Sequence, residues 1–393
     1  MKKANDTNQA LSDVRVLDLS RLVAGNMLSV VLADFGADVI KIERPGHGDD
    51  LRHWTEDGVE TWWKAYGRNK RSLVLDLKDQ LARDNLKKLT ASSQVLIENF
   101  VPGKLEELGL APDVLWAINP NLIIVRVSGW GQTGPYSHKP GFGTLVEAMS
   151  GFAHLNGYPD RPPALPPLAM ADMIAGLYGA FGVMAALRTI EQNQGKGQII
   201  DLTLFESMFS TVASEVIKHC ATGEVNMRSG NQAVNTAPRN VYVCADGQYV
   251  ALSASVQSMF ERLAITIGRE DLIKNEKFCT NEVRVQNRDE LNHILQEFFE
   301  QRTQSENLAL MEEAGVTLAP VLTVAELIDH PYITGREILQ PHPDPELGNV
   351  PLATPIPRLS QTPGKIQRLA PKLGQHTQEI LDMLKNQGTE NDA

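Results

Sequence analysis

The chain has 393 residues, of which 42% are hydrophobic, and a formal net charge of −11. This length and composition allow a large buried core, and we expect two or three domains. The acidic balance argues against nucleic-acid binding, because contacts to a phosphate backbone need a cationic surface. Cys220, Cys244 and Cys279 are widely spaced and form no CxxC pair, so we expect neither a disulfide framework nor a metal site.

Two features bear on localisation. The first residues of the sequence contain no apolar stretch of the kind found in a secretory signal. The charge-free run at 173–187 is shorter than the roughly 20 residues that a membrane-spanning helix needs. We therefore expect a protein of the cytoplasm that contacts no membrane.

The first half of the chain alternates predicted strands and helices. Apolar runs predict strands at 14–19, 38–43, 72–77, 94–99 and 122–127, with helical patterns between them. The first of these helices is expected to include 28–35 and to end at Gly36. Further along, 197–204 reads as a sixth strand and 205–220 as a helix. The alternation is typical of an α/β fold with a mainly parallel sheet.

The second half changes character after a polar, Gly/Asn-rich stretch at 224–237. A hairpin is expected at 241–253, since Asp-Gly between two β-rich runs is a strong turn signal. Predicted helices at 257–268 and 288–300 follow. We expect a large domain at 1–224, a small α+β domain at 225–330, and a proline-rich segment at 331–393 that is extended and wraps around other parts.

Asp172 is the only charged residue in the apolar stretch 165–187. Two prolines before it prevent an earlier helix start, so Asp172 should lie at the first turn or N-cap. After it, small residues recur every third position and should form a flat stripe on which another backbone can lie: Gly176, Gly179 and Gly182. A structural cap is the simplest explanation of Asp172. However, a carboxylate entering so apolar a helix needs hydrogen bonds or a chemical role, which makes Asp172 a candidate functional residue.

Two patterns could concern nucleotides. Basic residues are concentrated at 61–78, which suits a small polyanion such as a phosphorylated cofactor, or alternatively a solvated surface: Lys64, Arg68, Lys70, Arg71 and Lys78. The segment 129–134 satisfies G-x-G-x-x-G after a predicted strand. Pro135 and the residues after it cannot continue as the helix that a dinucleotide site needs, so we expect no NAD site of this type.

Several stretches resemble the class III coenzyme A transferases, the family of formyl-CoA transferase and the CaiB/BaiF proteins. They cover almost the whole chain: 22–26, 32–49, 68–78, 98–103, 128–135, 171–176, 360–364 and 370–377. The resemblance implies a Rossmann-like large domain built from both ends of the chain, a small domain, and an interlocked homodimer. It also implies that a coenzyme A thioester is a substrate and that no cofactor is tightly bound.

The resemblance assigns roles to individual residues. Asp172 matches the catalytic aspartate, which attacks the acyl-CoA thioester. Positions implied to bind CoA are Ala24, Arg44, Leu75, Lys78, Asn99 and Phe100. Lys104 is expected to replace a family arginine whose place Glu107 takes. Substrate contacts are expected from Val23, Phe142 and Arg239, the last as a carboxylate clamp or simply a surface arginine. Asn26 stands where the family usually has proline, and Val101 where it often has arginine.

Three functions remain open at this point. A CoA-transferase using succinyl-CoA or another dicarboxylyl-CoA as donor is favoured. An α-methylacyl-CoA racemase of the same fold typically carries Gly-His-Asp where this chain has the residues of 141–144, Gly-Phe-Gly-Thr, so one arm of its proton shuttle is missing. A CoA-binding protein without activity is the third alternative.

Overall fold

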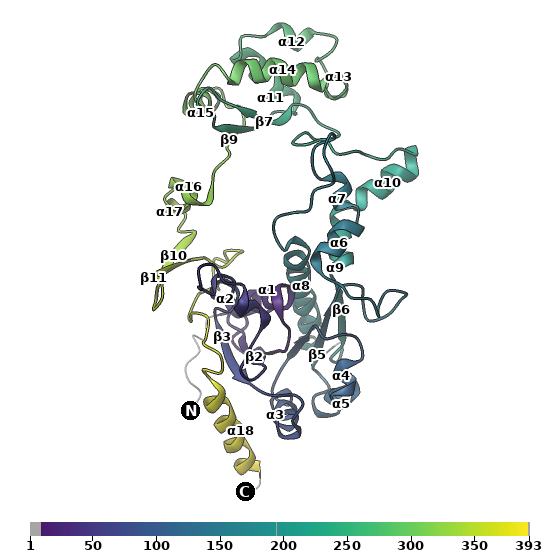
Figure 1. The fold of residues 1–393 in the computed structure, drawn as a ribbon, viewed down its shortest axis with the longest axis vertical. Coiled ribbons are helices and arrows are strands. Elements are labelled where there is room, and N and C mark those ends of the chain that lie inside the picture. Colours follow the sequence, from purple (N-terminus) through teal and green to yellow (C-terminus); the bar gives the residue numbers. More distant parts are fainter. Residues whose placement is uncertain (1–8, 194, 392–393) are drawn as a thin grey trace. The chain divides into compact units, whose positions relative to one another are not determined.

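The computed structural model describes residues 9–193 and 195–391 and divides into two compact units (Figure 1). Unit 1 contains the N-terminal part to Phe152, residues 165–214 and the C-terminal part from Gly335. Unit 2 contains 153–164 and 215–334. The predicted limits at 224/225 and 330/331 lie close to edges of these units. That the units are separate domains stays a prediction.

Unit 1 is built on a six-stranded sheet in the order β3-β2-β1-β4-β5-β6, in which every pairing is parallel. Its strands are β1 (Arg15–Asp18), β2 (Asp38–Glu43), β3 (Lys70–Val74), β4 (Val95–Glu98), β5 (Ile123–Ser128) and β6 (Ile199–Thr203). The predicted α/β class with a parallel sheet is therefore confirmed. The strand order reverses between β1 and β4, and in such sheets ligands bind at the carboxyl ends of the strands near this point.

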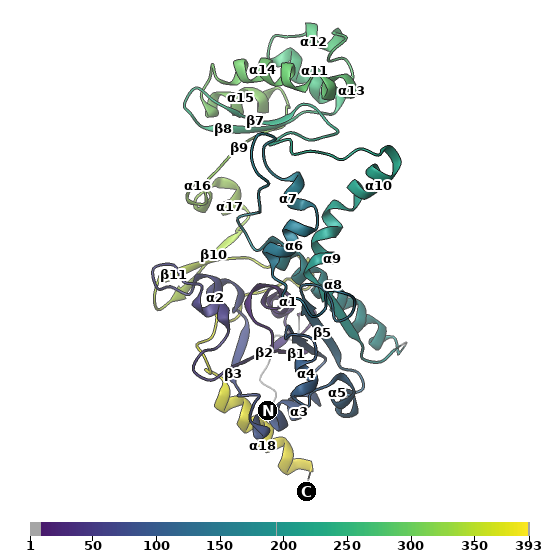
Figure 2. The same cartoon turned by 45° about the vertical axis from the view of Figure 1, so that its right-hand side comes forward.

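Helices cover both faces of the sheet (Figures 1 and 2). Apolar side chains of the strands pack against these helices on each face. One face packs against α1 (Leu22–Asp34) and α8 (Met170–Glu191). The other face is covered by α3 (Gln80–Thr90), α4 (Lys104–Glu107), α5 (Pro112–Ile118) and α18 (Thr377–Asn391). Burial on both faces explains why the strands read as continuous apolar runs.

The predicted glycine stripe lets α8 approach its neighbours closely. A Cβ on Gly176 would lie 2.7 Å from the Cβ of Met27, and one on Gly179 would lie 2.4 Å from Cδ1 of Leu28, both on α1. Gly182 faces β6, where a Cβ would meet Ile200 at 3.5 Å. With 22 residues and a mean hydropathy of 1.5 in its most apolar window, α8 could span a membrane by length and composition alone. Here one side of the helix packs on α1, β5 and β6, and 44% of its most apolar window is buried.

Shorter elements complete this part of the chain. They are η1 (Asp50–His53), α2 (Thr61–Tyr66), α6 (Gly143–Met149), α7 (Phe152–Leu155), α9 (Leu204–Phe209), η2 (Ser210–Val212) and α10 (Ala213–Thr222). The helix expected over 205–220 is therefore divided into α9 and α10 by a 3-10 turn. The first helix contains most of the predicted stretch 28–35 and begins earlier, at Leu22, whose amide donates to Asp49.

Unit 2 contains an antiparallel sheet of β7 (Arg239–Val243), β8 (Tyr249–Ser253) and β9 (Leu318–Pro320). The predicted hairpin is confirmed, with Gly247 in its turn at a φ of 78°. Aromatic side chains such as Tyr242, Phe260 and Phe299 fill its core. Its helices are α11 (Gln257–Thr266), α12 (Asp271–Lys274), α13 (Asn281–Gln286), α14 (Arg288–Phe299), α15 (Gln304–Glu313), α16 (Val324–Ile328) and α17 (Pro331–Gly335).

The proline-rich segment is more regular than expected. It forms an antiparallel hairpin of β10 (Leu339–Asp344) and β11 (Gly348–Ala353) and then ends in α18. Pro341 pairs with Pro351, which a two-stranded ribbon tolerates because its open edges do not need the missing N–H groups. The stretch between hairpin and helix does return to unit 1, where the carbonyl of Pro371 accepts hydrogen bonds from Arg52 and Trp63.

Candidate active site

Three helices begin around the carboxylate of Asp172. Asp172 lies in the first turn of α8, and its carboxylate accepts hydrogen bonds from the backbone amides of Ala24, in the first turn of α1, and of Asp172 itself. Gly143 is the first residue of α6, and a Cβ there would stand 2.5 Å from Oδ2 of Asp172. Only glycine allows this approach. Helix starts carry partial positive charge, which favours an anionic group at this place.

Burial and a second acid, Glu147, disfavour the ionised form of Asp172. Burial and, to a lesser extent, the charge of Glu147 raise the pKa of Asp172 from its usual value to about 6. Glu147 lies on α6, is only 3% exposed, and accepts a hydrogen bond of 3.1 Å from the amide of Ala171. Sequence reasoning noted Gly143 only as part of the segment 141–144 that departs from the racemase pattern, and it missed Glu147, which belongs to no recognisable motif. Asp172 is thus a nucleophile candidate that ionises just below neutral pH.

The start of α1 is fixed by Asp49 and Asn26. Leu22 takes a left-handed φ of 63°, and its amide donates to Oδ1 of Asp49 at 2.9 Å. Asn26 Nδ2 donates to Oδ2 of Asp49 at 2.7 Å and to the carbonyl of Leu22 at 2.6 Å. Its Oδ1 accepts from Nζ of Lys70 at 2.7 Å. Asn26, which stands in place of the usual proline, therefore joins a polar network that holds Ala24 near Asp172.

Below Asn26 the network becomes ionic and fully buried. Nζ of Lys41 lies 3.2 Å from Asp18 and 2.9 Å from Asp49. Burial alone would raise the pKa of Asp18, but the charges of Lys41 and Lys70 lower it below the usual value. Burial lowers the pKa of Lys70 to about 8. These paired charges order α1 relative to β1, β2 and β3.

This pairing corrects the interpretation of the basic run at 61–78. Four of its five basic residues bind carboxylates within unit 1 instead of facing a polyanion or solvent. The shortest of these ion-pair distances are 2.7 Å from Lys64 to Asp344, 2.6 Å from Arg68 to Asp34, 3.5 Å from Lys70 to Asp18, and 2.6 Å from Arg71 to Asp38. Lys78 is exposed and forms no ion pair within the described residues.

The positions expected to bind CoA follow the carboxyl ends of successive strands. Arg44 comes after β2, Leu75 and Lys78 after β3, and Asn99 and Phe100 after β4. The structure therefore brings them to one edge of the sheet. Lys104 opens α4, a few residues further along the chain. Leu75 is 6% exposed and Phe100 is partly buried against the same core cluster, so these two also serve packing.

Asn99 bridges the point where the strand order reverses. Its Oδ1 accepts from the amide of Arg21 at 2.9 Å, and its Nδ2 donates to the carbonyl of Arg21 at 2.8 Å. The loop after β4 is thereby tied to the loop after β1. Because both hydrogen-bonding groups of the Asn99 side chain are used, this residue shapes the edge of the sheet.

Basic side chains gather beside this bridge around a single carboxylate. Asp50 accepts from Arg44 at 3.0 Å, from His47 at 2.8 Å and from Arg21 at 3.4 Å. Arg44 is half exposed, so the cluster can meet an anion from solvent. Sequence reasoning selected Arg44 but missed Arg21 and His47. The structure adds both to the candidate site for phosphate groups.

Lys104 is less free than expected. Its Nζ lies 2.7 Å from the carboxylate of Glu107, and both side chains are more than half exposed. Glu107 therefore offsets the charge that was expected to replace a family arginine.

The expected substrate contacts have different surroundings. Val23 is 1% exposed and packs with Leu51 and Trp63, so its side chain fills the core beside α1. Phe142 is 61% exposed at the N-cap of α6, immediately before Gly143. Arg239 is an exposed residue at the start of β7 and belongs to unit 2, whereas Asp172 belongs to unit 1.

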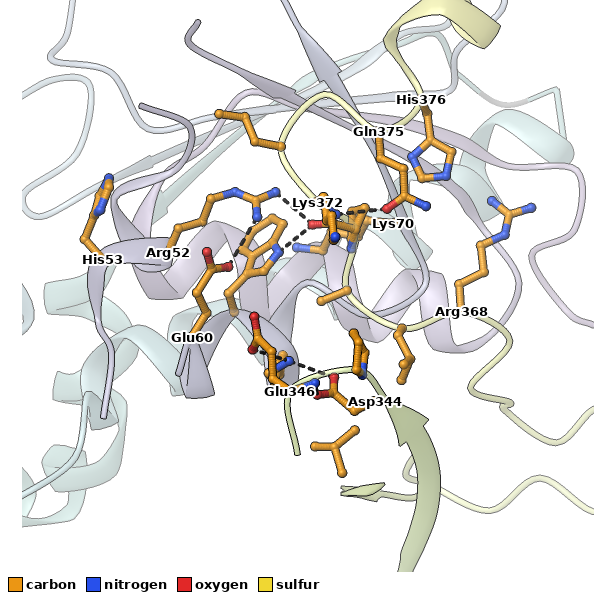
Figure 3. A pocket seen from close by; sticks show the side chains of 18 of the residues that line it. Arg52, His53, Glu60, Lys70, Asp344, Glu346, Arg368, Lys372, Gln375 and His376 are labelled. Atoms are coloured by element: carbon orange, nitrogen blue, oxygen red, sulfur yellow. Dashed lines mark hydrogen bonds and ion pairs between the residues drawn. The ribbon is translucent and has the colours of Figure 1, made fainter. Parts of the chain in front are cut away.

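A cavity of about 650 Å³ lies elsewhere in unit 1 (Figure 3). Its lining includes Arg52, Lys70, Arg368 and His376, and also His47 of the cluster around Asp50. It contains neither Asp172 nor any residue that the sequence predicted to bind CoA. Arg52 is bound bidentately by Glu43 and stacks on Trp63, so this basic group is already satisfied.

Two negative expectations can be compared with the structure. After β5, residues 129–142 contain no helix, so the G-x-G-x-x-G segment opens none, as predicted. Across residues 9–193 and 195–391, no group of three or more His, Cys, Asp or Glu side chains is arranged to hold a metal ion.

Comparisons with known proteins agree with this geometry. Residues 11–377 match the model of CoA-transferase family III. The succinyl-CoA–D-citramalate CoA-transferase of Chloroflexus aurantiacus is 38% identical over 94% of this chain and 92% of its own length. The succinate–glutarate CoA-transferase of Agrobacterium fabrum is 33% identical over 95% of this chain and 96% of that protein.

A solved structure extends the likeness to three dimensions. A CaiB/BaiF family protein from Brucella suis aligns with a TM-score of 0.84 at 35% identity, covering 96% of this chain and 100% of that one. Together with the match along residues 11–377, this shows an enzyme that transfers CoA. The chain belongs to CoA-transferase family III.

Proposed function

We propose that this enzyme transfers CoA from a dicarboxylyl-CoA such as succinyl-CoA to a carboxylic acid, with Asp172 as the nucleophile. The observation that carries the proposal is the desolvated carboxylate of Asp172 at the starts of α1, α6 and α8, with the amide of Ala24 bonded to it. The donor is suggested by the relatives, whose names include succinyl-CoA as donor to D-citramalate and a succinate–glutarate pair.

The reaction proceeds through two covalent forms of Asp172. Its carboxylate oxygen attacks the thioester carbonyl, the C–S bond breaks, and a mixed anhydride and CoA thiolate result. The thiolate then attacks the aspartyl carbonyl, which releases the donor acid and leaves an aspartyl-CoA thioester. The acceptor carboxylate attacks that thioester, expels the thiolate and forms a second mixed anhydride with Asp172. The thiolate then attacks the acceptor's acyl carbon, and the bond from this carbon to the Asp172 oxygen breaks. This forms the new acyl-CoA and regenerates Asp172. No net proton is consumed.

Two features of the surroundings of Asp172 support this chemistry: its partial burial and its hydrogen bond from the amide of Ala24. A carboxylate is a weak nucleophile in water, and removing its hydration shell makes it more reactive. The amide of Ala24 holds the carboxylate in one orientation, which reduces the entropy that the attack must lose.

Gly143 favours transfer over racemisation. A racemase needs a second proton-transferring side chain, and the family pattern places it at 142–143. Phe142 has no titratable group, and a side chain at 143 would overlap Asp172. Incubation of a chiral 2-methylacyl-CoA in deuterated water should therefore give no α-deuterium. Uptake without an acceptor acid would support the racemase instead.

We propose CoA binding along the carboxyl edge of the sheet. Arg44, with Arg21 and His47 around Asp50, and Lys78 would meet the phosphates. Leu75 and Phe100 would offer apolar surface to the adenine, while Lys104 would contribute despite its pairing with Glu107. The starts of α1 and α6, at Ala24 and Phe142, would face the acyl part, while the buried side chain of Val23 supports the start of α1 from the core.

We also propose that two chains form an interlocked homodimer in the cytoplasm. Support comes from apolar side chains that α8 leaves exposed, which a second copy would cover: Leu177 (51%), Tyr178 (50%), Phe181 (72%) and Met184 (42%). Light scattering after size-exclusion chromatography should give twice the chain mass of 43.3 kDa. A monomer would contradict this part of the proposal.

Trapping the covalent intermediate tests the nucleophile. The enzyme is incubated with succinyl-CoA and treated with borohydride, which reduces an aspartyl thioester to homoserine, and the peptide around 172 is analysed by mass spectrometry. We expect homoserine at 172 in the wild type and none in Asp172→Ala. Glu191→Ala is the matched control, because Glu191 is an exposed acid at the other end of α8. CoA exchange at the wild-type rate in Asp172→Ala would disprove the mechanism.

A further inference from the structure

We infer that Glu147 is a positioning residue for Asp172, which holds the first turn of α8 in place and keeps a second carboxylate against the nucleophile. The inference rests on the proposed role of Asp172. It adds Glu147, a residue of α6, to the candidate site. Glu147 accepts a hydrogen bond from the amide of Ala171, which lies 24 residues further along the chain.

The hydrogen bond of Glu147 acts on the peptide next to the nucleophile. Oε1 accepts from the amide of Ala171 at 3.1 Å, and Ala171 directly precedes Asp172. This amide is one of the four in the first turn of α8 that have no partner within the helix. Glu147 therefore does for α8 what a capping side chain does, but from α6.

Gly143 lies close to both acids. Gly143 and Glu147 are four residues apart on α6 and so lie on the same face of the helix. A Cβ on Gly143 would be 2.5 Å from Oδ2 of Asp172 and 3.8 Å from Oε1 of Glu147. The bare backbone of α6 at 143 is thus in contact with one carboxylate and near the other.

The charge of Glu147 is not balanced by a cation. It is 3% exposed and forms no salt bridge with any residue that the structure describes. A buried acid of this kind destabilises the fold unless it is used. Other charged side chains near α8 do not account for the raised pKa of Asp172. The elements packed against α8 carry Asp34 on α1, Glu206 on α9, Arg126 on β5 and Asp201 on β6, yet among charged side chains only Glu147 affects the pKa of Asp172.

The expected effect on catalysis has a definite sign. Negative charge beside Asp172 makes its carboxylate more basic, and a more basic oxygen attacks a carbonyl faster. The same charge raises the pH below which Asp172 is protonated and inactive. Removing it should therefore move the acid limb of the rate to lower pH and lower the plateau rate.

Glu147→Gln separates charge from hydrogen bonding. The amide oxygen of glutamine can still accept from Ala171, whereas the charge is lost. The rate of covalent adduct formation at Asp172 with succinyl-CoA is measured from about pH 5 to about pH 8, around the value to which the pKa of Asp172 is raised. In the variant, we expect the acid limb of the adduct-formation rate to lie at lower pH than in the wild type, and the maximum rate to be lower. A limb that coincides with the wild-type one would overturn the inference.

Two further variants complete the test. Glu206→Gln removes a charge from α9, which also packs on α8, and should leave the limb in place. Glu147→Asp keeps the charge on a side chain too short to reach Ala171, so the limb should stay while the plateau falls. If E147Q does not fold, an E147D enzyme with the wild-type plateau overturns the inference. If Asp172→Ala still forms the adduct, the proposed function itself fails, whatever the limb of E147Q shows.

Discussion

Replacing the proposed nucleophile should stabilise the protein. Asp172→Asn removes a group whose ionised form the folded chain disfavours, since burial and Glu147 raise its pKa from 3.8 to about 6. A difference of roughly 2 pKa units corresponds to about 3 kcal/mol of unfolding free energy. Asp172 is partly exposed to solvent, which screens the effect, so we expect a gain of about 1–3 kcal/mol at neutral pH.

The sign of the pH dependence follows from proton binding. Below about pH 4 the carboxyl group is protonated in both the folded and the unfolded chain, and ionisation of Asp172 does not affect stability. Between 3.8 and about 6 the unfolded chain ionises while the folded one keeps its proton, so stability decreases as pH rises. Above about 6 both are ionised and the loss is complete. The advantage of Asp172→Asn over the wild type must therefore grow across this interval and then level off.

Tryptophan fluorescence during urea unfolding can measure this difference. All five tryptophans lie in unit 1, so their signal follows the unit that contains Asp172: Trp54, Trp62, Trp63, Trp116 and Trp130. Glu191→Gln on the same helix is the control and should follow the wild type at every pH. A free-energy difference between Asp172→Asn and wild type that stays constant from about pH 4 to about pH 7, or decreases, would refute the reasoning.

Three other predictions follow from single contacts. Gly143→Ala should slow adduct formation roughly a hundredfold, because the new methyl would stand 2.5 Å from Oδ2 of Asp172; a wild-type rate in the borohydride assay would contradict the geometry. Gly179→Val should destabilise unit 1 by about 2 kcal/mol in urea unfolding, since its Cβ would overlap Leu28, whereas Gly182→Ala has room and should be tolerated. Arg44→Ala should raise the KM for succinyl-CoA roughly tenfold with little change in kcat, because one charge-assisted phosphate contact is lost. An unchanged KM in steady-state kinetics would remove Arg44 from the CoA site.

The sheet could be predicted because its signal is local. Most strands have an apolar centre, such as Val39-Ile40 in β2 and Leu96-Ile97 in β4, because both faces of the sheet are buried. The prediction for β3 was displaced, since it began at 72 whereas the strand begins at Lys70 and ends at Val74. Lys70 and Arg71 look like loop residues. They are buried in the strand because Asp18 on β1 and Asp38 on the adjacent β2 pair with them, which no local pattern reveals.

The candidate site was predictable only in part. Asp172 stands out as a lone acid in an apolar helix, and the residues at strand ends follow from the family resemblance. Glu147 and Gly143 come from a helix that precedes α8 by more than 20 residues and carry no recognisable spacing. Arg21, His47 and Asp50 meet only after β1 and β2 have paired. Their roles depend on tertiary contacts, which sequence patterns of this kind do not contain.

The basic residues at 61–78 also show that sequence patterns do not reveal tertiary contacts. A cluster of positive charge in an acidic chain suggested a polyanion, yet the partners are carboxylates of the chain itself, up to 280 residues away in the case of Lys64 and Asp344. Charge patterning in a sequence records how many charges lie together. It does not record which of them the fold neutralises.

The position of Asp172 depends on structure that is far from the reacting atoms. The carboxylate is held where ionisation is unfavourable, and its orientation comes from the amide of Ala24 on α1. That amide reaches Asp172 because Gly176 and Gly179 let the two helices touch. Asn26 and Lys41, through Asp49, then fix the start of α1 to the sheet with buried hydrogen bonds and ion pairs. The raised pKa of the proposed nucleophile persists only if its surroundings cannot relax around it, and the buried network supplies that rigidity at the start of α1.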